Sequence, residues 1–177
     1  MIIITTPYSL EKNLGKAYNE AMAMLPADDD WNIMRDVDTM FLDNKAPYHF
    51  AQAIKQKPDA GIFTCYASRT GRAQQKFNGT ISPDPSLINH RKIAIRQASV
   101  LSLKPITEPI AGFCMAVKKS TWKQLGGFKE EGILSIDLDF SRRVLQSGLK
   151  IWLIESVYML HYYRLIEGGP SYKEHLK

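Results

Sequence analysis

Residues 28–43 read DDDWNIMRDVDTMFLD, a short apolar run that is followed at once by two aspartates. The run at 31–34 has the length and apolar character of a buried strand, and Asp36 and Asp38 stand directly beyond its end. In an extended chain, residues two apart share a face, so both carboxylates are expected to point to one place. The stretch therefore predicts a sheet strand that carries a carboxylate pair at its carboxyl end.

The chain on either side of this stretch alternates between strand-like and helix-like patterns. An unbroken β-branched run at 2–5 predicts a buried strand, and helical spacing of apolar residues at 13–25 predicts a helix with Asn13 as its N-cap. Further strands are expected at 60–66, 111–117, 149–154 and 156–162, and further helices at 46–57, 86–103, 119–128 and 135–148. The polar stretch 67–85 predicts a long loop. This alternation predicts an α/β fold with a central, mostly parallel mixed sheet that is flanked by helices.

Length and composition fit one soluble domain. The chain has 177 residues, 45% of them hydrophobic, which is enough to bury a core. We expect a single domain over 1–177, with a first half at about 1–66, a second half at 86–164 and a tail at 165–177. Cys65 and Cys114 lie in apolar runs and are predicted to be buried free thiols. The start MIIITTPYS lacks the features of a signal peptide, and no apolar run has the ~20 residues of a membrane span, so a cytoplasmic protein is expected.

The formal charge of +5 and the pI of about 9.1 favour anionic partners, among them nucleotides, phosphates and nucleic acid. The basic segment NHRKIAIR at 89–96 has two interpretations. It is a solvated helix face, or it is a surface that binds nucleic acid. No longer block of like charge decides between them.

The carboxylate pair also has two interpretations. Two carboxylates aimed at one point repel each other unless a cation lies between them, and Mg²⁺ or Mn²⁺ suits such a site when substrate phosphates complete the shell. The alternative is a turn that is rich in acid. Asp28, Asp29 and Asp30 precede the strand and are expected to form a polar turn, while Asp43 is expected to be a surface or capping residue.

A second acidic group lies in SIDLDFSRRVLQSG at 135–148. Asp137 falls in the first turn of the predicted helix, where negative charge is favoured, so Ser135 or Asp137 is a candidate N-cap. The functional interpretation makes Asp137 a general base, which requires a carboxylate fixed near an acceptor hydroxyl. Asp139 and the pair Arg142-Arg143 would then orient the adjoining loop or balance a negative charge.

His161 ends the last predicted strand, inside VYMLHYYR. It is either a hydrogen-bonded residue at the rim of the core or a third metal ligand. The second interpretation requires that this strand end lie beside the acidic pair.

Taken in order along the chain, these segments resemble the family 2 glycosyltransferases of the GT-A fold, over about 15–164. No one motif is strong, and the resemblance depends on their order. The segments that carry it are GKAYNEA, WNIMRDVDTMFL, AGFCMAVKKSTWKQLGGF, IDLDFSRRVLQSGLKI and VYMLHYYR. The resemblance implies an unusually short GT-A member that transfers a hexose from a nucleotide-sugar, with UDP as the expected nucleotide, to an acceptor that the sequence does not identify.

The resemblance also implies roles for individual residues. Asp38 would bind Mn²⁺ or Mg²⁺, Asp36 would contact the ribose or complete the metal shell, and His161 would be a further ligand. Asp137 would take the proton of the acceptor hydroxyl, with inversion at the anomeric carbon. The other implied donor-binding residues are Thr6, Pro7, Tyr8, Lys16, Asn19 and Gly112, while Asp139 and Arg143 would lie around the acceptor or behind the base.

Two departures from the family pattern motivate another hypothesis. The strand–helix–strand unit that usually precedes the Lys16–x–x–Asn19 segment is missing, and Ile136 stands where the family has an acidic residue. These departures favour a nucleotide-sugar-binding domain without catalysis. A nucleic-acid-binding protein is a third hypothesis, based on the basic segment at 89–96. The sequence leaves the oligomeric state open.

Overall fold

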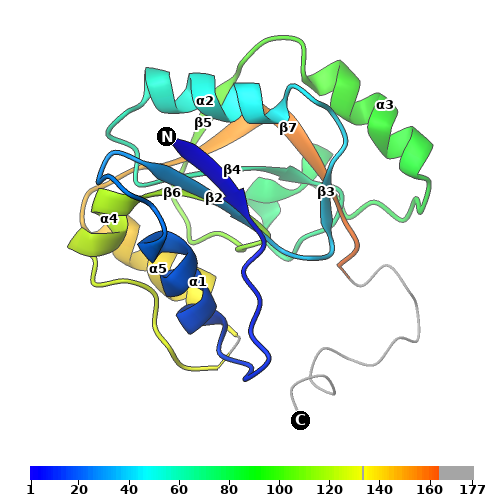
Figure 1. Ribbon diagram of the computed structural model, residues 1–177. Helices are drawn as coiled ribbons and strands as arrows, with labels where there is room; N and C mark the ends of the chain where they lie inside the picture. Colours follow the sequence, from blue (N-terminus) through cyan, green and yellow to red (C-terminus); the bar gives the residue numbers. More distant parts are fainter. Residues whose placement is uncertain (133, 164–177) are drawn as a thin grey trace.

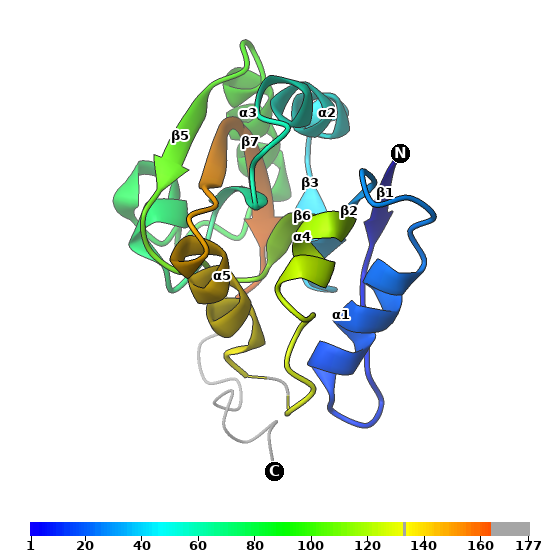
Figure 2. The same ribbon diagram turned by 90° about the vertical axis from the view of Figure 1, so that its left-hand side faces the viewer.

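A computed structural model of the chain describes residues 1–132 and 134–163, and within them a mixed sheet lies between two groups of helices (Figures 1 and 2). The predicted α/β class is confirmed. The predicted tail at 165–177 lies outside the described residues. The strands are β1 (Ile2–Thr5), β2 (Trp31–Arg35), β3 (Thr39–Phe41), β4 (Ile62–Ala67), β5 (Leu103–Ile106), β6 (Cys114–Lys118) and β7 (Ile151–His161). The helices are α1 (Leu14–Ala23), α2 (Ala46–Gln56), α3 (Leu87–Gln97), α4 (Lys119–Gln124) and α5 (Ile136–Gln146), with short 3₁₀ turns at Ala73–Gln75 and Phe77–Gly79.

The strand order is β1-β2-β6-β4-β7-β3, with β5 pairing to β7. Parallel pairing joins β1 to β2 and β4 to β7, and the other described pairs are antiparallel. The expectation of a mostly parallel sheet therefore holds only for those two pairs. Because β6 runs antiparallel between β2 and β4, the sheet is mixed at its centre.

Two apolar clusters cover the two faces of the sheet. On one face α1, α4 and α5 enclose Tyr18, Phe128 and Phe140, and on the other Phe50 of α2 and Phe63 of β4 belong to one buried cluster. Figure 1 shows the same division, with α2 and α3 on one side of the sheet and α1, α4 and α5 on the other. The central strands β2, β4 and β6 are buried on both faces, which explains why they read as continuous apolar runs rather than alternating ones. The prediction of a buried strand at 2–5 is wrong, because β1 lies at the edge of the sheet and Ile2 and Ile4 are exposed. Cys65 and Cys114 are buried free thiols, as predicted.

Several predicted boundaries are wrong. The helix expected at 86–103 ends at Gln97, and the next residues form β5, which includes Pro105. Pro105 is compatible with a strand here because β5 pairs on one side only, with β7, so no ladder donor is lost. The strands expected at 149–154 and 156–162 are one strand, β7. The short strand β3 was not expected at all.

Within the described residues, no helix combines the length and the apolar character that a membrane crossing requires.

Candidate functional site

A cavity of about 400 Å³ lies at the end of β2 and draws its lining from widely separated parts of the chain. Five residues that the sequence singled out line this one cavity: Asp36, Asp38, Gly112, Asp137 and His161. They come from the turn after β2, the segment before β6, the first turn of α5 and the end of β7. The cavity therefore collects the candidate metal ligands and the candidate base in one place.

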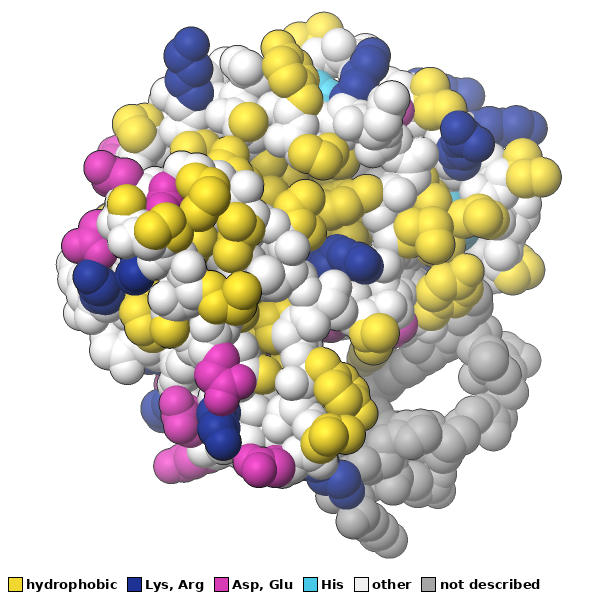
Figure 3. All heavy atoms as spheres, in the orientation of Figure 1, with side chains coloured by type: hydrophobic (Ala, Val, Ile, Leu, Met, Phe, Trp, Pro, Cys, Tyr) yellow, Lys and Arg dark blue, Asp and Glu magenta, His cyan; other side chains and the backbone are white. Residues whose placement is uncertain are grey.

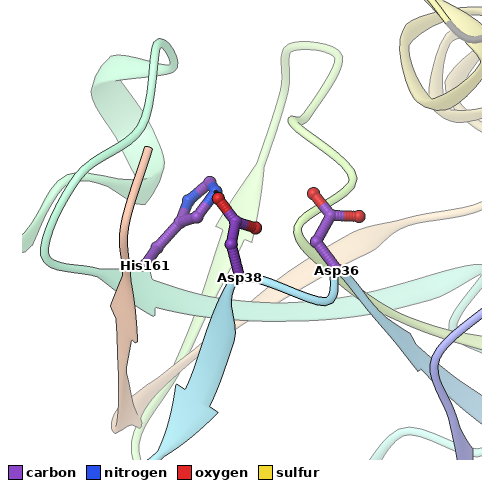
Figure 4. Close-up of side chains that lie close together, drawn as sticks. All are labelled: Asp36, Asp38 and His161. Carbon is purple, nitrogen blue, oxygen red and sulfur yellow. Dashed lines mark ion pairs between the residues drawn. The ribbon is translucent and has the colours of Figure 1, made fainter. Parts of the chain in front are cut away.

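The turn between β2 and β3 fixes the two aspartates. Thr39 donates both its amide N–H and its hydroxyl to the carbonyl oxygen of Asp36, at 3.2 and 2.7 Å. The amide of Asp36 donates to the carbonyl of Phe113, at 3.0 Å. Residues 36–38 are thus a turn and not the extended segment that the sequence predicted, although the two carboxylates still converge, as Figure 4 shows.

The pairing of β3 with β7 brings His161 to this turn. Thr39 stands opposite His161, and the amide of Tyr162 donates to the carbonyl of Asp38 at 3.0 Å. Ser68 holds the backbone of His161 on its other side, where its hydroxyl oxygen accepts from the His161 amide at 3.0 Å. The ring of Phe113 lies 5.2 Å from the imidazole, centroid to centroid. The predicted condition for a third ligand is met, because the end of β7 lies beside the acidic pair.

Asp36, Asp38 and His161 fit a divalent cation. Each offers one ligand atom, and the three atoms lie within 4.8 Å of one another. His161 Nε2 lies 3.5 Å from Asp38 Oδ2, and among the described residues His161 Nδ1 is buried without a hydrogen-bond partner. Two carboxylate oxygens and one imidazole nitrogen suit Mn²⁺, and Mg²⁺ would rely mainly on the oxygens.

The electrostatics of the aspartates differ. Burial raises the pKa of Asp36 to about 6; the charge of His161 opposes this effect, and the charges of Asp38 and Asp137 add to it. For Asp38 burial acts in the same upward direction, but the hydrogen bond and charge of His161 outweigh it and lower the pKa. A cation between the two carboxylates would relieve the repulsion that disfavours the charged form of Asp36.

Asp137 lines the same cavity from the first turn of α5. Its Oδ2 accepts a hydrogen bond of 2.6 Å from the amide of Gly112. Burial raises the pKa of Asp137, and hydrogen bonds from the amides of Gly112, Leu138 and Asp137 itself oppose that rise. The residue before α5 is Ser135, and its side chain makes no capping hydrogen bond. The Asp137 carboxylate accepts hydrogen bonds from amides of the first turn of the helix. Both interpretations of Asp137, helix capping and proton acceptance, are compatible with this geometry.

The other predicted donor-binding residues do not line this cavity. Tyr8 and Lys16 share a separate cavity of about 300 Å³ beside α1, and Thr6 and Pro7 lie in the loop between β1 and α1. Asn19 binds the segment after α4, with Oδ1 accepting from Trp122 Nε1 and from the Phe128 amide, both at 2.8 Å. The structure therefore gives Asn19 a role in holding the chain together.

Asp139 and Arg143 hold the segment that follows α4, which fits the expectation that they orient a loop. Arg143 Nε donates to Asp139 Oδ2 at 2.8 Å, and its other nitrogens donate to the carbonyls of Leu125 and Gly127. Lys129 Nζ lies 3.0 Å from Asp139 Oδ1. The pair therefore ties α5 to the segment that follows α4.

The remaining acidic residues are engaged outside this cavity. Asp28 pairs with Lys123 and Asp29 with Lys118, which agrees with the predicted polar turn. Asp30 is buried and binds the amino group of Met1 and the amide of Ala27. Asp43 accepts from the Lys45 amide at 2.6 Å in the turn before α2. The N-cap of α2 is Lys45 and no side chain caps this helix, so Asp43 is a turn residue and not a helix cap.

The basic segment at 89–96 lies on α3. Arg91, Lys92 and Arg96 are exposed there, and Figure 3 shows basic side chains on the surface above that helix, mixed with apolar ones. These exposed basic side chains agree with the interpretation of 89–96 as a solvated helix face.

Tyr18 and Arg72 also line this cavity, although the sequence analysis did not select them. The Tyr18 hydroxyl makes a hydrogen bond with Asp36, and Arg72 places a positive charge near Asp137. A signal for Tyr18 existed, since it stands four residues after Leu14 on the buried face of α1, and a buried tyrosine usually has a partner for its hydroxyl. Arg72 lies in the loop at 67–85 and had no such signal.

The chain matches no protein-family model, and no curated protein sequence matches it. The function of the cavity therefore has to be inferred from its own residues.

Proposed function

We propose that this chain is an inverting, metal-dependent glycosyltransferase that moves a hexose from a nucleotide-diphosphate sugar, with UDP as the expected nucleotide, to an acceptor hydroxyl. One observation carries the proposal. A single cavity of about 400 Å³ holds a ligand set for a divalent cation and, from a different element, a half-buried carboxylate with a raised pKa. Sugar transfer from a nucleoside diphosphate needs both parts.

Asp36, Asp38 and His161 would hold the cation. When bound, it supplies Lewis-acid stabilisation of the negative charge that forms on the departing nucleoside diphosphate. Tyr18 orients Asp36 through its hydroxyl, and Ser68 fixes the backbone of His161. The aspartates and the histidine come from elements that the sheet pairing holds together, so the ligand set is preorganised.

Asp137 would act on the acceptor. Its carboxylate takes the proton of the attacking hydroxyl while the new bond forms at the anomeric carbon and the bond to the diphosphate oxygen breaks. The raised pKa strengthens the carboxylate as a proton acceptor, and such a base contributes about 10²–10⁴-fold to the rate. The Gly112 amide holds one oxygen at 2.6 Å and so fixes the direction of the other. Attack from the face opposite the leaving group inverts the configuration.

The first experiment is a thermal-shift measurement with UDP, with and without Mn²⁺. We expect UDP to raise the unfolding temperature only when Mn²⁺ is present, and Asp38→Ala to remove that shift. Asp29→Ala is the matched control, since its carboxylate is 91% exposed and pairs with Lys118 outside the cavity. An equal shift in wild type and Asp38→Ala would exclude this metal assignment.

A second candidate function is a nucleotide-sugar-binding domain without catalysis. The observation that favours it is the set of amide hydrogen bonds to Asp137, which already gives this carboxylate a structural role. Donor hydrolysis in the presence of Mn²⁺ separates the two candidates. The transferase proposal predicts turnover that Asp137→Asn abolishes while UDP binding persists, whereas donor binding without any hydrolysis or transfer would support the binding domain.

A further inference from the structure

A larger cavity, of about 560 Å³, lies apart from the candidate site, and none of its lining residues lines the smaller cavity. Tyr66 at the end of β4, residues 73–79, the segment after α3 and part of β7 line it. Its lining is rich in amides and hydroxyls, with two aromatic rings. The polar lining residues are Gln74, Asn78, Gln97, Ser99, Ser102 and Ser156.

An irregularity in β7 creates this cavity wall. Along the parallel pair of β4 and β7, Cys65 stands opposite Ile154, but the next residue, Tyr66, stands opposite Tyr158. Residues 155–157 are therefore extra on β7, and two of them, Glu155 and Ser156, line the cavity. Bulges of this kind redirect side chains and are frequent next to binding sites.

Ser156 carries an unused hydrogen-bonding group at this wall. The residue is 3% exposed, and among the described residues its hydroxyl has no hydrogen-bond partner. A buried hydroxyl without a partner costs about 1–3 kcal/mol. Because the Ser156 oxygen is itself buried, a ligand in the cavity does not reach it, and the acceptor that the bulge offers to the cavity is the half-buried Glu155 carboxylate.

Glu155, the residue before Ser156, has its carboxylate fixed by hydrogen bonds. Its Oε2 accepts from the Ser102 hydroxyl at 2.6 Å and its Oε1 from the Tyr66 hydroxyl at 3.2 Å. The backbone carbonyl of Glu155 accepts from Gln97 Nε2 at 3.3 Å. The carboxylate is therefore fixed by neutral donors, and it remains a charged acceptor at the cavity wall.

We propose that this cavity is a saccharide-binding site. A sugar presents many hydroxyls, each of which both donates and accepts, together with an apolar C–H face. Neutral amides and hydroxyls with one fixed carboxylate match the hydroxyls, and the rings of Tyr66 and Phe77 offer apolar surface for the C–H face. The lining also contains Lys76 and Lys104, but the Glu155 carboxylate opposes a purely anionic ligand such as phosphate.

One wall separates this saccharide site from the candidate metal site. Thr70, Gly71 and Arg72 line the smaller cavity, and the residues that follow them, from Ala73 on, line the larger one. Gln75 fixes the wall from inside, with Nε2 donating to the Ala111 carbonyl at 3.0 Å and Oε1 accepting from the Ala111 amide at 2.7 Å. Binding here needs neither metal nor nucleotide, so the saccharide site does not depend on the proposed transferase activity.

The test is two-dimensional amide NMR of the full chain, titrated with N-acetylglucosamine, maltose and inorganic phosphate, without metal or nucleotide. We expect at least one of the sugars to shift amides around 73–79, 99–104 and 155–157. Glu155→Gln should weaken that sugar's affinity by about threefold to tenfold, because a charged acceptor becomes a neutral one. The unfolding temperature should change little, because the glutamine oxygen can still accept from the Ser102 hydroxyl.

Two control variants sharpen the result. Ser147→Ala removes a hydroxyl at the end of α5 that donates to the Val144 carbonyl, and Asp38→Ala removes a candidate metal ligand; both should keep the sugar affinity of the wild type. Sugar-induced shifts confined to the surroundings of Asp36 and Asp137 would overturn the proposal, as would shifts with phosphate alone. The same holds if neither sugar shifts the amides of the cavity wall.

Discussion

Gly112 and Asp137 show how one missing side chain shapes the candidate site. A Cβ at residue 112 would lie 2.7 Å from Asp137 Cβ and 3.3 Å from Asp137 Oδ2. Real Cβ atoms do not approach so closely, so glycine is what permits the 2.6 Å hydrogen bond between the Gly112 amide and the carboxylate. The position of the candidate base thus depends on a residue that has no side chain of its own.

Gly112→Ala is therefore expected to displace the Asp137 carboxylate. If Asp137 is the base, turnover falls by about 10²–10⁴-fold, while Mn²⁺-dependent UDP binding is kept. Gly71→Ala is the matched control, because it lines the same cavity and its added Cβ would meet only Tyr163 Oη, at 4.0 Å. Steady-state kinetics with a donor binding measurement checks the prediction, and equal turnover in the two variants would contradict it.

The raised pKa of Asp36 predicts that its charged form, which the proposed metal site needs, lowers the stability of the metal-free protein. Its carboxyl has a pKa of about 6 in the folded protein, against an ordinary value of 3.8. The folded state therefore favours the protonated form, and the corresponding stability is present below about pH 4 and lost as the pH rises through about 6. In the presence of a chelator, Asp36→Asn should raise the unfolding free energy at neutral pH by about 1–3 kcal/mol.

Denaturant unfolding of wild type and Asp36→Asn across this pH range measures the effect. The difference between the two proteins should grow as the pH rises from about 4 to about 7, with the variant the more stable at the upper end. A variant that is less stable at neutral pH would show that Tyr18 and the surrounding groups favour the charged carboxylate.

At the scale of elements, α1 is fastened to the segment after α4 by Asn19. Its amide nitrogen donates to the Phe128 carbonyl at 2.9 Å and to Glu130 Oε1 at 2.8 Å, and its oxygen accepts from Trp122 and from the Phe128 amide. Gly127 has a φ of +79°, and a Cβ there would lie 2.9 Å from Asn19 Oδ1. The turn Gly126-Gly127 therefore lets the chain pass close to this asparagine.

Asn19→Ala should lower the unfolding free energy by about 2–4 kcal/mol, since half-buried partners on two elements lose their hydrogen bonds. UDP binding, measured well below the unfolding temperature, should change little. Asn44→Ala, at an exposed asparagine, is the control and should leave stability unchanged within about 0.5 kcal/mol. Loss of UDP binding with intact stability would instead support the nucleotide contact that the family resemblance implies.

The same elements show what the sequence could and could not predict. Long periodic segments such as α1, α2 and α5 were predicted closely, because their apolar spacing reflects one buried face. Strands β3 and β5 were missed, since Thr39–Phe41 is too short for a pattern and Leu103–Ile106 contains a proline. Their pairing with β7 is a contact between distant segments, which no local pattern records.

The candidate site shows the same limit at the level of side chains. Asp36, Asp38, Asp137 and His161 were selected from the order of segments, and they line one cavity because β3 pairs with β7 and α5 begins beside Gly112. The turn at 36–38 was predicted as extended. Tyr18 and Arg72 were missed, because their roles depend on which distant carboxylate they meet.

For the whole molecule, the proposed cation would connect segments that are distant in sequence. Asp36 lies directly after β2, Asp38 lies directly before β3, and His161 lies at the end of β7, which pairs with β4. An ion that binds only the folded arrangement stabilises it by mass action, by about 2.7 kcal/mol at a concentration of 100 Kd. Protons compete with the ion, because Asp36 takes up a proton as the pH falls through about 6.

Mn²⁺ should therefore raise the unfolding temperature at neutral pH and do so much less at about pH 5. The temperature shift is measured at several Mn²⁺ concentrations with wild type, Asp38→Ala and Asp29→Ala, and a chelator should reverse it. Asp38→Ala should lose most of the shift at both pH values, while Asp29→Ala keeps it. If Mn²⁺ stabilises wild type equally at both pH values, the ion binds without Asp36, and the site has to be sought elsewhere on the molecule. Because no nucleotide takes part, the measurement tests the metal site separately from the transferase activity.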